Sequence, residues 1–499
     1  MKYEVGFDNE KYLRTQSEQI RKRIGQFGGK LYLEFGGKLF DDYHASRVLP
    51  GFAPDTKLRM LSKLSDSAEI VIVINAGDIE NNKIRGDIGI TYDTDVFRLI
   101  DAFRARGLYV GSVVIAQYAG QRSADAFRAK LTAAGIRSFL HYTIEGYPLN
   151  ISHIVSEEGF GKNEYIETTR PLVVITAPGP GSGKMATCLS QLYHENKRGI
   201  KAGYAKFETF PIWNLPLKHP VNLAYEAATV DLSDVNMIDP YHLEAYGTLA
   251  VNYNRDVEVF PVLNAMFEQI SGVSPYKSPT DMGVNMVGFC IEDDEVVKQA
   301  SYDEIIRRYF RVICEKRKGR VKQDALDRIN LLMKQAGISE DDRPVVAAAR
   351  ERSENLTDRT HPEAVAIELP DGRIVTGKTS PLLGPASAAL LNAVKELSGI
   401  DDDLHLIEPE TIEPIQRLKL DILGNRNPRL HSDEALIALS ICASKGGFAD
   451  EAFQHLSELR ECEAHSTTIF AQVDEDIYRK LGINLTCDPS YNSKNLFHK

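Results

Sequence analysis

The sequence lacks the features that mark membrane and secreted proteins. No apolar run approaches the roughly 20 residues that a membrane-spanning helix requires, and the opening residues 1–8 contain no apolar signal-peptide core. The 6 cysteines are scattered over 499 residues without a Cys-x-x-Cys pair, which is typical of free thiols in a reducing compartment. We therefore expect a cytoplasmic protein with no membrane partner.

The chain also lacks an excess of positive charge and a recognisable metal motif. It has 59 Lys and Arg residues against 70 Asp and Glu residues, a net charge of −11, which argues against a nucleic-acid partner. The late residues that could bind a metal have spacings that match no zinc-site pattern; they are Cys442, Cys462, His465 and Cys487. We therefore expect no zinc.

What the first half does contain is an alternation of apolar runs with helical patterns. Residues 69–75 are almost entirely Val and Ile, as in parallel strands that are covered on both faces. Similar runs predict further strands at 31–35, 109–117, 137–142, 172–176 and 202–207. Strands and helices in this order predict right-handed βαβ units and a doubly wound, mostly parallel sheet. We assign residues 1–235 to one Rossmann-like α/β domain.

Beyond residue 235 the apolar pattern changes. Residues 236–358 form a mainly helical region, whose clearest helix is predicted over 302–316 with Ser301 as its N-cap and Glu304 completing a capping box. Residues 359–499 predict an α+β domain that opens with a hairpin at 364–377. The predicted fold class is α/β, with a helical middle and a C-terminal α+β domain.

The most informative segment is a glycine-rich loop between the strand at 172–176 and a helical pattern. Backbone N–H groups in such a loop converge on an anion, the helix N-terminus adds partial positive charge, and Lys184 can reach the outer phosphates. The segment departs from a Walker A loop at Pro178, where glycine is expected, and at Met185, where Ser or Thr would bind Mg²⁺. The predicted cofactor-binding residues are Gly179, Gly181, Ser182, Gly183, Lys184, Met185 and Thr187.

Three other positions are candidate partners of this loop. Gly36, Gly37 and Lys38 follow the first strand, and Lys38 could pair with a phosphate. Asp78 follows the strand at 69–75, on the side where open α/β sheets bind ligands. Asp231 follows the apolar residues 227–230 and is the best candidate for a Walker B acid. In this hypothesis Lys184 neutralises developing charge, and Asp231 or Asp78 binds a metal or acts as a base.

Three segments together carry a family resemblance: the loop 179–184, residues 206–217 and residues 462–468. Over essentially its whole length the chain resembles the bacterial uncharacterised protein family 0371, also called domain of unknown function 1846. The hairpin at 364–377 and the helix that follows are similar to the opening of the cytidine-deaminase fold. Ala386-Ser387-Ala388 stand where that fold carries a zinc ligand and its proton shuttle, so the resemblance implies the topology without the deaminase chemistry.

These observations leave three functions open. The first is an enzyme that binds ATP, another nucleotide or a phosphorylated small molecule and catalyses phosphoryl or ligase-type transfer, with its dependence on Mg²⁺ undecided. The second is a non-catalytic ligand-binding or scaffold protein, and the third a metal-assisted hydrolase that uses the Asp78 loop. Homo-oligomerisation is compatible with all three.

Overall fold

The computed structural model describes residues 4–36, 39–40, 42–85, 89–232, 234–355 and 363–491. The chain forms two compact units. The N-terminal unit comprises Val5–Glu226 and Asp234–Lys298, and the C-terminal unit comprises Met1–Glu4, Ala227–Ser233 and Gln299–Lys499. Within the described ranges, no helix has both the length and the apolar character needed to cross a membrane.

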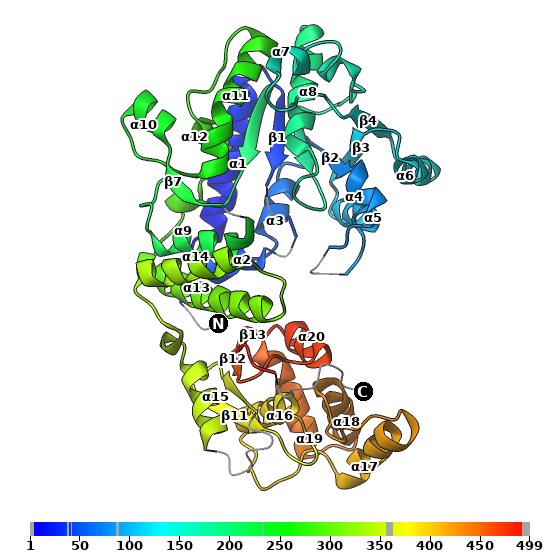
Figure 1. Cartoon of the computed structure of the whole chain (residues 1–499), viewed down its shortest axis with the longest axis vertical. Coiled ribbons are helices and arrows are strands. Elements are labelled where there is room, and N and C mark those ends of the chain that lie inside the picture. Colours follow the sequence, from blue (N-terminus) through cyan, green and yellow to red (C-terminus); the bar gives the residue numbers. More distant parts are fainter. Residues whose placement is uncertain are drawn as a thin grey trace. The chain divides into compact units, whose positions relative to one another are not determined.

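The N-terminal unit is built on a seven-stranded sheet in which every pair of neighbours is parallel (Figure 1). The strand order is β4-β3-β2-β5-β1-β6-β9. The strands are β1 (Leu31–Phe35), β2 (Ala68–Asn75), β3 (Tyr109–Tyr118), β4 (Ser138–Tyr142), β5 (Leu172–Thr176), β6 (Gly203–Phe207) and β9 (Gly283–Val284). The predicted α/β class and parallel sheet are confirmed.

Helices cover both faces of this sheet, which explains why its central strands are mostly apolar. α8 (Lys184–Lys197) and α11 (Asn254–Ser271) share a core with alternate residues of β1, β5 and β6, among them Tyr32 and Tyr204. Phe207 points to the opposite face, where Lys57 of α3 (Thr56–Ser62) lies over its ring and α1 (Asn9–Gln26) packs beside α3. The side chains of β6 therefore point alternately to the two faces of the sheet.

The order of the strands creates a topological switch point between β2 and β5. After β2 the chain passes through α4 (Ala76–Glu80) and α5 (Tyr92–Arg104) to β3 on one side. After β5 it passes through α8 to β6, on the other side. Loops that diverge in this way leave a crevice at the carboxyl ends of the strands, which is where open α/β sheets bind ligands. The glycine loop 177–183 lies at this point.

Several elements of the N-terminal unit were not predicted. The sequence patterns did not reveal α1 or the short edge strand β9, and a two-stranded sheet pairs β7 (Asn236–Ile238) with β8 (Val251–Tyr253). The remaining helices of this unit are α2 (Tyr43–Val48), α6 (Arg122–Ala133), α7 (Ile151–Ile154), α9 (Pro220–Ala228), α10 (Pro240–Tyr246) and α12 (Pro279–Met282). Residues 234–298 thus contact the sheet rather than standing apart from it.

The C-terminal unit contains a mixed sheet of order β11-β10-β12-β13, so the predicted α+β region is confirmed. The predicted hairpin is present as β10 (Ala364–Glu368) and β11 (Ile374–Lys378), whereas β12 (Glu463–Ser466) and β13 (Asn484–Cys487) run parallel. Its helices include α14 (Gln323–Ala336), α15 (Pro344–Glu354), α16 (Pro385–Ser398), α17 (Pro409–Arg417), α18 (Ser432–Ala443), α19 (Phe448–Gln454) and α20 (Gln472–Leu481).

One predicted helix start is wrong. α13 spans Asp294–Arg317, so it begins seven residues before the predicted cap at Ser301. Ser301 is fully buried in the interior of the helix and does not stand at its N-terminus. The capping-box pattern was misleading because Asp294 and Glu295 in the first turn already satisfy the acidic preference of a helix N-terminus.

Candidate functional site

The glycine loop has the backbone conformation that an anion cradle needs. Gly181 and Gly183 adopt φ values of +73° and +94°, which L side chains rarely adopt. Gly183 is the N-cap of α8 and has no side-chain capping bond, so the helix N-terminus is open to an external acceptor. A side chain at Gly179 would overlap the hydroxyl of Tyr92, so that position also requires glycine.

Polar groups without partners surround this loop. In the described parts of the chain, no acceptor receives a hydrogen bond from the backbone N–H groups of residues 181–186. The hydroxyls of Ser182 and Thr187, which are 2% and 0% exposed, likewise have no partner among the described residues. Buried polar groups are normally satisfied, and here donors and hydroxyls of one short segment remain free together. The loop therefore contains several hydrogen-bond donors that have no acceptor among the described residues.

The two residues after Gly183 have different roles. Lys184 is half-buried at the first position of α8 and forms no ion pair with any described residue. Met185 packs against the apolar core below the sheet face, so its side chain fills space there and offers no hydroxyl to a metal. One turn later, burial raises the pKa of the Cys188 thiol well above its usual value, and the nearby Glu34 carboxylate adds to this shift. Cys188 therefore remains a neutral thiol.

The end of β2 approaches the loop, as its place in the sheet predicts. The Asn75 side chain donates a hydrogen bond to the carbonyl oxygen of Gly181 (3.3 Å). Asp78 in α4 accepts a bond from Lys83 (3.1 Å), and the Lys83 ammonium lies 5.0 Å from the centre of the Tyr92 ring that covers Gly179. A continuous row of contacts thus connects Asp78 with the loop, and the second carboxylate oxygen of Asp78 has no partner within the described residues.

The other predicted partners are placed differently. Gly36 donates its N–H to the carbonyl of Phe207 (3.2 Å), and a Cβ at this position would lie only 3.0 Å from that oxygen, so Gly36 serves the close packing of β1 and β6. Gly37 and Lys38 lie outside the described residues. Asp231 is exposed in a 3-10 helix (Val230–Leu232) of the C-terminal unit. Residues 220–228 before it form α9, whereas a Walker B acid follows a strand.

The structure also reveals a buried ionic cluster that the sequence patterns missed. Lys206, the penultimate residue of β6, is 8% exposed and donates hydrogen bonds to Asp256 and to the hydroxyl of Tyr253. Its ammonium lies 2.6 Å from Glu208, which also accepts a bond from Tyr253 (3.1 Å). A lysine inside a strand of a mostly apolar parallel sheet was the available signal, since such a charge is buried only with partners.

Electrostatics within this cluster favour a proton on Glu208. Burial raises the pKa of the Glu208 carboxyl to about 7, with Lys206 opposing the shift and Asp256 adding to it. Burial by itself would lower the pKa of Lys206, but the Asp256 and Glu208 carboxylates hold it well above its ordinary value. The lysine is therefore permanently charged, and Glu208 exchanges a proton near neutral pH.

Glu208 also lines a pocket of about 170 Å³ at the edge of the sheet. The pocket borders β9 and is shaped by Trp213, with side chains contributed by α1, α10, β8 and α12. Its lining includes Arg23, His242, Asn252 and Asp281. Because β6 lies two strands from β5, this pocket and the glycine loop share the carboxyl edge of one sheet without sharing a residue.

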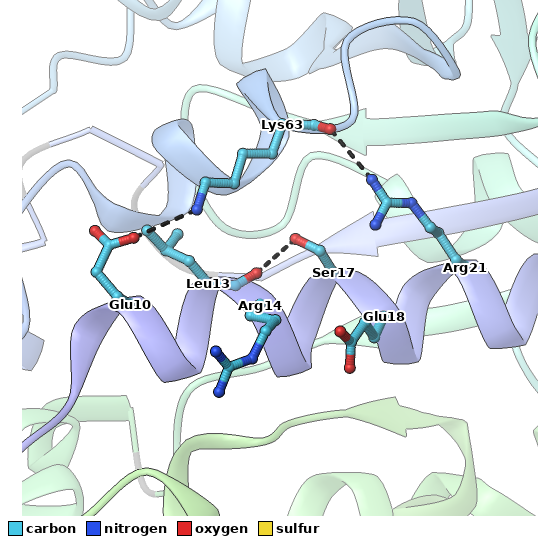
Figure 2. Close-up of a pocket in the computed structure, with 7 residues that line it drawn as sticks. All are labelled: Glu10, Leu13, Arg14, Ser17, Glu18, Arg21 and Lys63. Atoms are coloured by element: carbon cyan, nitrogen blue, oxygen red, sulfur yellow. Dashed lines mark hydrogen bonds and ion pairs between the residues drawn. The ribbon is translucent and has the colours of Figure 1, made fainter.

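A second, larger hollow of about 320 Å³ lies along α1 (Figure 2). Its wall consists mostly of charged side chains that bond within the wall: Lys63 donates to Glu10 (3.4 Å), and Arg21 donates to the carbonyl of Lys63 (3.4 Å). Arg14 and Glu18 are exposed. Its polar groups do not converge on a common point, so we do not treat it as a site.

The late cysteines and His465 do not form a metal centre. Among the residues with described positions, no three His, Cys, Asp or Glu side chains lie together as a set of metal ligands. His465 is fully buried in β12, where its Nδ1 contacts the hydroxyl of Thr486 (2.9 Å). Ala386 and Ser387 are buried at the start of α16, and the Ser387 hydroxyl donates to the carbonyl of Leu430 (2.8 Å).

Comparison with known proteins places the whole chain in one family. A model of domain of unknown function 1846, N-terminal, matches residues 5–337, and its C-terminal counterpart matches residues 341–497. A UPF0371 protein of Streptococcus thermophilus (strain CNRZ 1066) is 59% identical over 493 residues, 99% of each chain. A UPF0371 protein of Streptococcus pyogenes serotype M5 (strain Manfredo) is 57% identical over 495 residues, again 99% of each. The chain therefore belongs to the uncharacterised protein family 0371.

Proposed function

We propose that the loop 179–184 binds the phosphate group of a nucleotide or another phosphorylated small molecule. The observation that carries the proposal is the set of unpartnered backbone N–H groups of residues 181–186 at the N-terminus of a 14-residue helix. Such donors, with the positive end of the helix dipole, are suited to a phosphate. The position of the loop at the switch point between β2 and β5 supports the same conclusion.

The side chains around the loop fit this ligand. Lys184 forms no ion pair with a carboxylate among the described residues. Its ammonium group would therefore neutralise the negative charge of a bound phosphate, and any further charge that develops during a reaction. The buried hydroxyls of Ser182 and Thr187 are available as further donors. A phosphate bound here would supply the hydrogen-bond acceptors that these groups otherwise lack.

The reaction class depends on whether a metal accompanies the phosphate. The usual Mg²⁺ hydroxyl is absent because Met185 packs into the core, which favours binding that does not need Mg²⁺. Asp78 is the acid with a connection to the loop, through Lys83 and Tyr92. Phosphoryl or ligase-type transfer therefore requires Asp78 as the base or metal ligand, whereas the non-catalytic function requires only the loop.

A thermal-shift titration of the full-length protein tests the proposal, with inorganic phosphate, ATP, GTP and a sugar phosphate, each with and without Mg²⁺. We expect at least one phosphate ligand to raise the melting temperature, and Lys184→Ala to abolish the shift. Lys162→Ala is the matched control, since Lys162 is an exposed lysine in a surface ion pair with Glu158.

The outcomes separate the alternatives. A shift that needs Mg²⁺ and disappears in Asp78→Asn supports transfer chemistry. A shift in melting temperature that depends on neither Mg²⁺ nor Asp78 supports a binding protein. If folded protein gives no shift with any phosphate ligand, or if Lys184→Ala binds as well as the parent, the loop is not a phosphate site.

A further inference from the structure

We propose that the pocket beside Glu208 binds a small ligand that carries a positively charged amine, and that Glu208 releases its proton to solvent when the ligand binds. This site is separate from the glycine loop, with which it shares no residue. The proposal rests on the balance of charge in the buried cluster, on the size of the pocket and on its aromatic wall.

The cluster contains two carboxyl groups but, among the described residues, a single cation that bonds them. Lys206 is shared between Asp256 and Glu208, and no other cation bonds either carboxyl group in the described structure. Asp256 lies in the first turn of α11, where the helix dipole stabilises its negative charge. Glu208 is therefore the group that takes up a proton, and a second cation in the pocket would replace that proton.

The pocket places Glu208 where such a cation can reach it. Glu208 is the member of the cluster that lines the pocket, and its Oε1 is held by Lys206 and Tyr253. The ideal Cβ position of Gly283 on β9 lies 3.9 Å from the other carboxylate oxygen, Oε2. A side chain at 283 would occupy this space, so glycine leaves room beside Glu208.

The remaining wall is suited to a small organic cation. The Trp213 indole is fixed by a hydrogen bond from its N–H to the carbonyl of Asn285 (2.9 Å), and aromatic faces attract ammonium groups within about 6 Å. Asp281 also lines the pocket, and its carboxylate accepts hydrogen bonds from the Tyr246 hydroxyl (2.9 Å) and from the backbone N–H of Lys277 (2.9 Å). The volume of about 170 Å³ lies below the roughly 300–1,000 Å³ of drug-sized pockets, so the ligand is a short amine.

A phosphate is a poor match for the same pocket. The Glu208 carboxyl group lines it, and Nη2 of the Arg23 guanidinium already donates to the backbone carbonyl oxygens of Asp281 and Gly283. The charged and titratable groups that face Glu208 from the surrounding elements are Lys206 on β6, Tyr225 on α9, Tyr253 on β8, Asp256 on α11, and Arg23, His242 and Asp281 across the pocket. Lys206 is the only one of these cations that bonds Glu208 in the described residues.

Calorimetric titration of the full-length protein with ethanolamine and 1,3-diaminopropane tests the proposal, with ethylene glycol as the neutral comparison. Because the pKa of Glu208 is about 7, binding at about pH 7 should release about half a proton per ligand, measured from the heats in buffers of different ionisation enthalpy. The amine affinity should fall roughly 30-fold from about pH 8 to about pH 5.5, as Glu208 becomes protonated.

Four variants complete the test. Glu208→Gln should weaken amine binding and abolish both the proton release and its pH dependence, whereas Glu18→Gln, the same change at an exposed position on α1, should alter neither. Trp213→Leu leaves the ionic cluster intact and should still weaken binding. Lys184→Ala should leave amine binding unchanged, which distinguishes this site from the phosphate loop.

The proposal is overturned if the folded protein binds neither amine, or if it binds ethylene glycol as tightly as ethanolamine. It is also overturned if Glu208→Gln retains the affinity and proton release of the parent, because then the proton comes from another group. Binding that is lost in Lys184→Ala would assign the amine to the glycine loop and equally refute it.

Discussion

Removing the Lys206 ammonium should destabilise the N-terminal unit more than almost any other single charge deletion. In Lys206→Met the carboxylates of Asp256 and Glu208 and the Tyr253 hydroxyl lose their shared donor, while their side chains remain mostly buried. Breaking a buried ion pair from one side costs about 3–5 kcal/mol, because a charge is left uncompensated. We expect a loss in this range at about pH 8, where Glu208 is ionised in the parent.

The pH dependence of this loss is a sharper test than its size. At about pH 5 one carboxyl group can protonate, so the variant should recover part of its stability relative to the parent. A second variant, Lys206→Met with Asp256→Asn, should also recover part of the loss because one of the stranded charges is removed. Additive costs for the two changes would mean that the groups are not coupled.

The assay is urea unfolding followed by tryptophan fluorescence. Trp213 is the only tryptophan in the chain and belongs to the N-terminal unit, so the signal reports that unit alone. Lys63→Met is the control: Lys63 and its partner Glu10 are 47% and 65% exposed, and exposed pairs contribute at most about 1 kcal/mol. A loss below about 1 kcal/mol for Lys206→Met, or one that is equal at both pH values, would refute the reasoning.

Two further predictions concern the same sheet edge. Because the pKa of Glu208 is raised from 4.5 to about 7 on folding, this carboxyl group contributes its full stability below about pH 4.5 and loses it as the pH rises through about 7; the urea midpoint of Glu208→Gln should therefore fall less between these values than that of the parent. Gly183→Ala should cost about 1–2 kcal/mol of stability because φ is +94° there, and it should also reduce the thermal shift given by phosphate. An unchanged urea midpoint in that variant would show that the loop readily adopts another conformation.

The sequence by itself determined the features that depend on local chemistry. The Val and Ile runs of β2 and β5 predicted a parallel sheet because only strands covered on both faces are apolar at every position. Gly181, Gly183 and the helix after them predicted an anion-binding loop. Both the backbone conformation of such a loop and the dipole of the helix arise within one short segment of the chain. Asp78 was expected at the same sheet edge as the loop because both segments follow neighbouring strands; its connection to the loop runs through Lys83 and Tyr92.

Only the tertiary structure decided what depends on partners distant in the chain. Lys206 and Asp256 are 50 residues apart, so neither the charge cluster nor the raised pKa of Glu208 could be read from local patterns. The same holds for β9, whose two residues are a strand only because β6 offers them a parallel edge. Asp231 shows the opposite case: an apolar run followed by an acid resembled a strand end, yet residues 227–232 comprise the end of α9 and a 3-10 helix, and they are grouped with the other compact unit.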